Sequence, residues 1–278
     1  MRGSLAVSLL AVASTLHAAE AGADQAAELA KQLSNPIASL ISVPFQANED
    51  FDIGPANGDR FTLNIQPVIP ISLNKDWNLI LRTILPIIDQ HDVFGNSGTQ
   101  SGLGNTTQSF FFSPKAPGPG GIIWGVGPVG YYPTNTDNLL GPDKWGLGPT
   151  LVALVQEKAW TVGVLANQIW SVGGDNNEQN ISSMFLQPFV TYTTKTHTTF
   201  GLNTESSYDW EDNQWTVPIN LSVSQILKLG KQPVSIQLGG RYYAEGPSGH
   251  PNWGLRLVFT LLYPQHHAPP ATHTSDAK

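Results

Sequence analysis

The sequence predicts an all-β protein: a closed antiparallel up-and-down transmembrane β-barrel of about 12 strands. Three observations support this prediction, namely segments that alternate apolar and polar residues, connections that alternate in length, and aromatic residues at segment ends. The clearest segment is WGLRLVFTLLY at 253–263, where every second residue is apolar and Arg256 lies in the other row. A membrane barrel explains this pattern, because each strand needs only one apolar row and its other row faces the lumen.

The composition fits a membrane barrel and argues against several other classes. Only 13% of the 278 residues are charged, whereas a typical soluble domain has about 25%. The formal net charge of -7 argues against nucleic acid as a partner, because its backbone requires a basic face. Cysteine is absent, so the chain has no disulfide framework and no thiolate metal site.

The first residues have the pattern of a secretory signal peptide. Arg2 supplies the positive charge, and the apolar core at 5–16 is too short to span a bilayer. Leu29 and Leu33 then lie four residues apart, which fits either a short helix or a disordered leader. We expect export to the cell outer membrane, with this organisation along the chain: a signal peptide at 1–19 (cleavage at 18–21), a short periplasmic leader or helix at 20–36, the barrel at 37–264 and a flexible periplasmic tail at 265–278.

The strands are predicted from period-two alternation. They are expected at 37–46, 60–73, 77–89, 106–114, 122–134, 145–157, 160–173, 181–194, 198–211, 215–227, 234–246 and 252–263. Short connections, each with a lysine, alternate with longer or more acidic ones such as ANEDFDIGPANGD and QHDVFGNSGTQSGLGN. This alternation predicts short turns at one end of the barrel and longer loops at the other.

The two rows of each strand predict which face meets lipid. In 215–227 an apolar row opposes a row of Thr, Asn and Ser, and other polar rows are likewise rich in Asn, Gln, Ser, Thr and Gly. We therefore expect a wet lumen, and a dry apolar centre would contradict this interpretation. Aromatic residues at the segment ends predict the belts of a membrane interface: Trp77, Trp145, Trp160, Trp210, Trp215, Trp253 and Tyr263.

Charged residues of the inward rows form the candidate site. Arg241 and Arg256 are expected to lie roughly opposite each other, so that their repulsion requires a compensating acid or a passing anion. Either a charge-selective constriction or a salt-bridge network that stiffens the barrel would satisfy this requirement. The predicted lumen-facing cluster consists of Arg60, Arg82, Glu205, Asp209, Arg241, Glu245 and Arg256.

Other motifs predict little chemistry. GVGPVG at 125–130 matches a dinucleotide-binding pattern, but no helix follows it, so glycines in a crowded lumen explain it better. The histidines of the tail at 265–278 fit a solvated extension better than a metal site, and we expect no cofactor, no metal and no catalytic residue. Seven prolines interrupt the predicted strands without an evident reason: Pro67, Pro70, Pro86, Pro128, Pro149, Pro188 and Pro218.

Several segments resemble a bacterial outer-membrane β-barrel family that is named for a protein of the meta-cleavage pathway of phenol degradation, and whose members are called transporters or, mistakenly, neuromedin U. The segments are NPIASLISVPFQ, FTLNIQPVIPISLNKDWNLILRTILPI, SFFFSPK, KWGLGPT, FLQPFVTYTTKT and LNTESSYDWEDNQWTVPIN. The resemblance spans about 35–264 and implies an outer-membrane barrel with a transport role, without assigned site residues. One departure is Asn105, where the family is expected to have an acid.

These observations predict a porin-like channel or transporter for passive or facilitated passage of small molecules, with apolar or aromatic compounds suggested by family analogy. The alternatives are an outer-membrane lipid-modifying enzyme and a non-conducting structural or surface barrel. Expected partners are outer-membrane lipid, the barrel assembly machinery, which would read NWGLRLVF at 252–259, and a small-molecule solute. The substrate, the openness of the lumen and the oligomeric state do not follow from the sequence.

Overall fold

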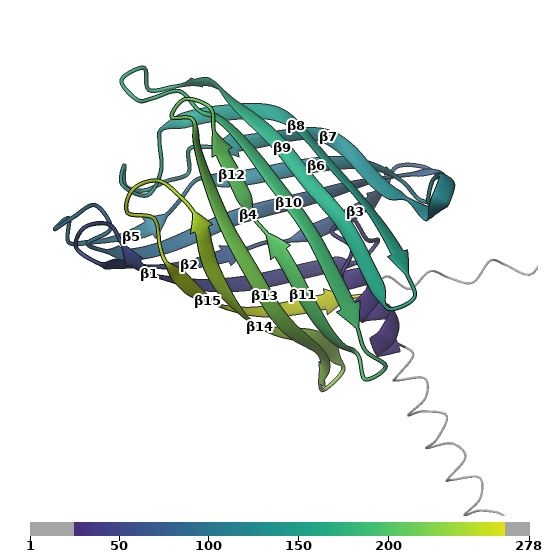
Figure 1. The fold of residues 1–278 in the computed structure, drawn as a ribbon. Helices are drawn as coiled ribbons and strands as arrows, with labels where there is room; N and C mark the ends of the chain where they lie inside the picture. Colours follow the sequence, from purple (N-terminus) through teal and green to yellow (C-terminus); the bar gives the residue numbers. More distant parts are fainter. Residues whose placement is uncertain (1–24, 265–278) are drawn as a thin grey trace, which may run out of the picture.

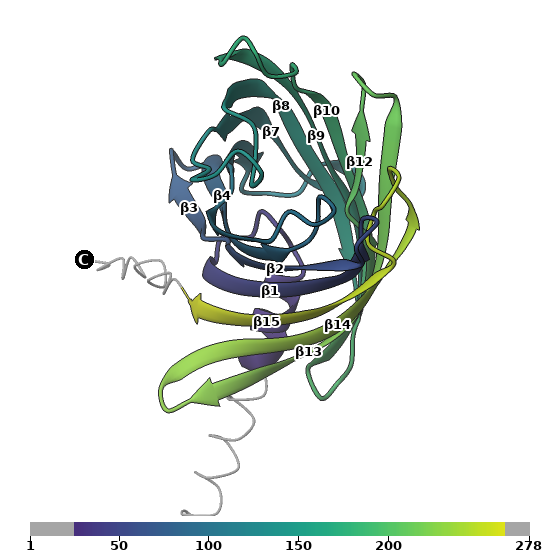
Figure 2. The same ribbon diagram turned by 90° about the vertical axis from the view of Figure 1, so that its left-hand side faces the viewer.

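The computed structural model describes residues 25–264, which form one closed antiparallel barrel (Figure 1). Closure is complete because β15 pairs with β1 along eleven residues of each strand (Figure 2). Three wall strands are each split in two (β2 with β3, β5 with β6, and β11 with β12), so the fifteen segments make twelve wall strands, and the predicted fold class is confirmed. The segments are β1 (Ile41–Ile53), β2 (Gly58–Ile65), β3 (Val68–Ser72), β4 (Trp77–His91), β5 (Thr99–Leu103), β6 (Thr106–Pro114), β7 (Ile123–Tyr132), β8 (Lys144–Glu157), β9 (Trp160–Gly174), β10 (Ser182–Thr193), β11 (Thr198–Thr204), β12 (Ser206–Asp209), β13 (Gln214–Leu229), β14 (Gln232–Glu245) and β15 (Trp253–Tyr263).

Two predicted boundaries were wrong. The first strand was expected at 37–46 but runs over Ile41–Ile53, so most of the predicted acidic loop belongs to the wall. The residues of β5 were expected in a loop, yet they pair with β4. Both errors arose where polar residues concealed a continuing alternation.

A helix at 25–33 and an irregular segment at 34–40 precede β1. The helix lies at one end of the barrel (Figure 1), which we call the terminal end; the opposite end is the loop end. Among the described residues, no helix is long and apolar enough to cross a membrane. The signal peptide predicted at 1–19 and the tail predicted at 265–278 lie outside the described residues.

Connections differ between the two ends as predicted. Those at the terminal end include the two-residue turns 158–159 and 230–231, and a 3-10 turn at Pro119–Gly121. Those at the loop end reach the eleven residues of 133–143. Short turns at the end that holds the chain termini and longer loops at the other are the pattern of outer-membrane barrels.

The outer wall is mostly apolar. Leu221 and Leu238 are exposed at 66% and 58%, on a face where a soluble monomer would not tolerate so much contiguous apolar surface. Aromatic pairs border this band at both ends, with Trp160 and Tyr192 at the terminal end and Phe51 and Trp253 at the loop end. The eleven residues of β15 span about 33 Å along the strand, or about 25 Å at a tilt of about 40°, which is the height of a bilayer's apolar core in such barrels.

The strand prolines lie where the hydrogen-bond ladder is already interrupted. Pro67 separates β2 from β3, Pro218 sits at a register shift between β13 and β14, and Pro188 faces the break between β11 and β12. Pro128 and Pro149 pair with each other beside gaps in the adjoining ladders. Because proline lacks an N–H group, these positions cost fewer ladder bonds than regular ones would. The prolines therefore accompany bends in the wall.

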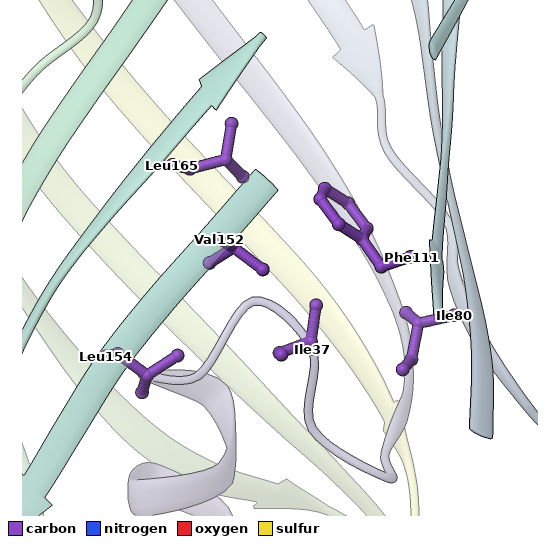
Figure 3. Packing of buried hydrophobic residues seen from close by; sticks show 6 residues of the cluster. All are labelled: Ile37, Ile80, Phe111, Val152, Leu154 and Leu165. Atoms are coloured by element: carbon purple, nitrogen blue, oxygen red, sulfur yellow. The ribbon is translucent and has the colours of Figure 1, made fainter. Parts of the chain in front are cut away.

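The expectation of a wet lumen was wrong for part of the wall. Inward side chains of β4, β6, β8 and β9 form a dry apolar cluster around Ile37, which enters from the irregular segment (Figure 3). The members are Ile37, Ile80, Phe111, Val152, Leu154 and Leu165. We call this group the luminal core. The rest of the wall, from β13 through β15 to β2, presents mostly polar inward side chains, as predicted.

Candidate functional site

The inward polar rows bring two predicted residues, Arg256 and Glu205, into one buried layer. Arg256 of β15 is 5% exposed, and Nη1 and Nη2 donate to both carboxylate oxygens of Glu205 at 2.8 and 2.7 Å. Its Nε donates to Asn48 Oδ1 at 2.7 Å, so all three guanidinium nitrogens are used. Glu205 lies in the break between β11 and β12, where the interrupted ladder turns its side chain across the lumen. Such a bidentate pair is strong and geometrically specific.

Arg241 pairs with an acid that the sequence analysis placed in a loop. Its Nη1 donates to Asp50 Oδ2 at 3.1 Å, and its guanidinium lies 5.3 Å from the ring centroid of Tyr243. Gly254 is the cross-strand neighbour of both Asp50 and Arg241. A Cβ at Gly254 would collide with Asp50 Oδ1, so the glycine makes room for the ion pair.

The two arginines were expected roughly opposite each other, and they are not. The register pairs Arg241 with Gly254 and Arg256 with Gly239, so each arginine faces a glycine and the two are diagonal neighbours. This offset of two residues gives each guanidinium its own carboxylate. Two separate ion pairs therefore compensate the expected repulsion between the two guanidinium groups.

Arg60 and Arg82 differ from the two paired arginines in their hydrogen-bond partners. Arg60 Nε donates to Gln90 Oε1 at 2.8 Å, and Arg82 Nη2 donates to Gln66 Oε1 at 3.3 Å. Within 25–264, the carboxylates in salt-bridge contact with arginine are those of Asp50 and Glu205, and neither pairs with Arg60 or Arg82. These two arginines therefore have only amide oxygens as hydrogen-bond partners.

Two members of the predicted cluster lie elsewhere. Asp209 caps the turn at 210–213, where its Oδ1 accepts from the backbone N–H groups of Glu211 and Asp212. Glu245 is exposed at the loop end of β14. Sequence reasoning also missed four partners, Asn48, Asp50, Gln66 and Gln90. The apolar positions Phe45, Ala47 and Phe51 of β1 would have revealed the first two, because they continue the outward row past the acidic residues.

The interior holds separate cavities on either side of this layer. A loop-end vestibule of about 580 Å³ is lined by Asp50, Arg60 and Tyr243, among others. A central cavity of about 230 Å³ lies against Arg82 and Gln66 on one wall and Phe189 on the other, with the irregular segment 34–40 as part of its boundary. Outside the lumen, a groove of about 450 Å³ lies at the terminal end between the helix and the turns at 158–159 and 194–197, where half of the lining residues are exposed.

The N-terminal segment is held by specific contacts at the terminal end. Leu29 and Leu40 are 3% exposed and pack in one cluster with Leu262 of β15. Gln156 Nε2 donates to the carbonyl of Lys31 at 2.8 Å, and Asn78 Nδ2 donates to Ser39 Oγ at 3.0 Å. With Ile37 in the luminal core, the segment reduces the free cross-section of the lumen.

Two sequence features receive a structural account. Gly125, from the glycine motif, faces inward, and a Cβ there would lie 3.2 Å from Phe111 and 3.4 Å from Ile37, which fits a crowded lumen. Asn105 Nδ2 donates to the carbonyl of Pro142 at 2.7 Å and to Tyr131 at 3.0 Å. An acid could not donate these bonds. In 25–264, no group of three or more His, Asp or Glu residues is arranged to hold a metal ion.

Comparisons with known proteins identify the fold. No family model and no curated protein matches the chain. The chain is similar to the COG4313 outer membrane channel from Pseudomonas putida F1, with 15% identity, a TM-score of 0.64, and coverage of 81% of this chain and 96% of that one. It also matches the KdgM porin in complex with disordered oligogalacturonate, with 11% identity, a TM-score of 0.43, and coverage of 81% of this chain and 99% of that one. A further match is outer membrane phospholipase A from Escherichia coli, with 12% identity, a TM-score of 0.47, and coverage of 80% of this chain and 92% of that one. The first of these similarities shows the fold, which is that of an outer-membrane β-barrel.

Proposed function

We propose that this protein is an outer-membrane channel for small molecules, narrowed by its own N-terminal segment. The observation that supports this most is the pair of cavities of about 580 and 230 Å³ inside a closed barrel. A filled structural barrel would have no need of such spaces, since small barrels pack their interiors with side chains. The fold similarity to a known outer membrane channel supports the same function.

The proposed orientation places the terminal end in the periplasm. The turns at that end contain Lys75, Lys115, Lys158, Lys195 and Lys231, whereas the loop end contains most of the acidic connections. An exported barrel with both termini inside agrees with this arrangement. The sequence resemblance to the transporters named for the meta-cleavage pathway supports the same proposal, including small apolar or aromatic solutes.

Passage requires the irregular segment to shift, and the natural absence of cysteine allows a direct test. The double variant Ser39→Cys and Asn78→Cys places two thiols on side chains that are in hydrogen-bond contact. A short cleavable thiol cross-linker would then fix the segment to β4. Each single variant, treated identically, is the control.

The purified barrel would be refolded into planar bilayers and liposomes and given a panel of neutral solutes of increasing size. We expect single-channel steps and solute entry with the untreated protein, reduced entry after cross-linking, and recovery after cleavage. A barrel that is folded by heat-modifiable gel mobility but passes no ion and no solute in any state would refute the proposed function. Equal entry with and without the cross-link would refute the role of the segment.

A further inference from the structure

The inward-facing arginines of the lumen outnumber the carboxylates that pair with them. Four arginines, at positions 60, 82, 241 and 256, accompany two carboxylates, those of Asp50 and Glu205, so this set has a net charge of about +2. The charges of Arg241 and Arg256 are balanced by Asp50 and Glu205 in the two ion pairs. The excess charge belongs to Arg60, which lines the loop-end vestibule, and to Arg82, which lines the central cavity.

The environment of Arg82 leaves its binding capacity largely unused. A guanidinium has five N–H donors, and the hydrogen bond that Arg82 makes within 25–264 is a single one of 3.3 Å to Gln66. Arg82 is half-buried. A guanidinium that is partly withdrawn from water normally has a carboxylate or several acceptors, because an incompletely paired charge is unfavourable there. The donors of Arg82 therefore suit an anion that occupies the cavity.

Both walls of the cavity combine polar and apolar groups. Gln66 and Val68 lie on the wall of Arg82, and Val68 is its cross-strand neighbour. Gln187, Phe189 and Asn203 line the opposite wall, where Phe189 and Asn203 are cross-strand neighbours. Val68 and Phe189 also pack against the luminal core. Thr191 Oγ1, on a residue that lines the cavity, is buried and has no hydrogen-bond partner in the described part of the chain. An inorganic anion would use the polar groups only.

We infer that the central cavity is a binding site for a small organic carboxylate with a compact apolar body, held by Arg82. The guanidinium binds both oxygens of the carboxylate, since its planar fork matches that group. Gln66 orients the guanidinium from the adjoining break in the wall. The apolar body lies against Phe189 and Val68. This inference rests on the proposed channel function, and it names the class of solute that the channel selects.

The test measures binding separately from passage. Benzoate, its neutral analogue benzamide and the cation benzylamine would be titrated into the detergent-folded full-length barrel by calorimetry. We expect benzoate to bind at least about ten times more tightly than benzamide, because a charge-assisted hydrogen bond contributes on the order of a ten- to hundredfold change in affinity, and benzylamine not to bind. Arg82→Gln should remove the preference for benzoate, and Arg82→Lys should keep a weakened one.

The matched control is Arg60→Gln, which removes the same charge from the loop-end vestibule. It should leave the dissociation constant of benzoate within about twofold, because Arg60 does not line the central cavity. Chloride titration distinguishes an apolar-bodied ligand from a simple anion: equal competition by chloride at the benzoate concentration would contradict the inference. Heat-modifiable mobility confirms folding of each variant, and Arg82→Lys replaces Arg82→Gln should the latter fail to fold.

Failure of this inference is distinguishable from failure of the channel. Benzamide and benzoate that enter liposomes equally, with no calorimetric preference and no effect of Arg82→Gln, would overturn the carboxylate site and leave the channel intact. Benzoate that binds at Arg82 but never crosses the wall would support the site and refute the proposed passage. Passage of benzoate faster than benzamide, with loss of that ratio in Arg82→Gln, would support both.

Discussion

The Arg256–Glu205 ion pair offers the sharpest prediction about stability. Glu205→Gln keeps the volume of the side chain and one acceptor oxygen but removes the negative charge opposite a guanidinium that is 5% exposed. Removal of one partner from a buried pair typically costs about 3–5 kcal/mol, because the other charge stays buried. The Glu205 side chain is 21% exposed, so water offsets part of this cost and we expect about 2–4 kcal/mol.

A loss of this size is a factor of about 30 to 1,000 in the unfolding equilibrium. Urea titration of the barrel in lipid vesicles, followed by the fluorescence of its 8 tryptophans, would measure the change in free energy of unfolding. Glu245→Gln is the matched control, since Glu245 is exposed and forms no salt bridge within 25–264. It should change the free energy by less than about 0.5 kcal/mol.

The double variant Glu205→Gln with Arg256→Gln tests the reasoning further. Because neither charge is then left buried alone, its destabilisation should be smaller than the sum of the two single variants. Equal destabilisation by Glu205→Gln and Glu245→Gln, or strictly additive effects in the double variant, would refute the view that this pair stabilises the layer.

Two further predictions concern a close approach and a loop. Gly254→Ala should lower the free energy of unfolding by about 1–3 kcal/mol, because the added Cβ would displace Asp50. The control is Gly240→Ala on the outer face, where a Cβ would have no atom within 4 Å and should not destabilise the barrel. Urea titration of both variants measures the difference. Asn105→Asp should lower the free energy of unfolding by about 1–3 kcal/mol, because the side chain no longer donates to Pro142 and Tyr131. The loop 133–143 should then be cleaved faster by a protease. Asn138→Asp, at an exposed position in the same loop, is the control and should leave the cleavage rate unchanged.

The outer surface could be predicted from the sequence because lipid imposes the same local rule on every strand. A side chain that faces hydrocarbon must be apolar, so a period of two along one segment identifies its outward row. The outward row of β15, from Trp253 to Tyr263, is apolar throughout, and each of its residues is exposed or half-buried, whereas the alternate residues are buried. The same rule explains why Arg256 was correctly placed on the inward face.

The luminal partners could not be predicted in the same way, because they depend on distances across the barrel. Glu205 and Arg256 are 51 residues apart, and they meet only because a break in one wall strand faces the opposite wall. Asp50 and Arg241 are 191 residues apart, and the sequence placed Asp50 in a loop because acids surround it. The alternation along one strand determines which face of the wall a side chain lies on. The tilt and register of all the strands determine which side chains meet across the lumen.

The dry part of the lumen was missed for a related reason, and it restricts the movements open to the proposed channel. Leu29, Ile37 and Leu40 of the N-terminal segment are each at most 4% exposed. Each such side chain contributes about 1.5–3 kcal/mol through burial, so withdrawal of all three into water would cost about 5–9 kcal/mol. A state of that energy is populated to less than about one part in a thousand. In the proposed channel, passage therefore requires a shift of 34–40 that keeps Ile37 and Leu40 out of water, rather than expulsion of the whole segment, and this is why a cross-link at Ser39 alone is expected to reduce it.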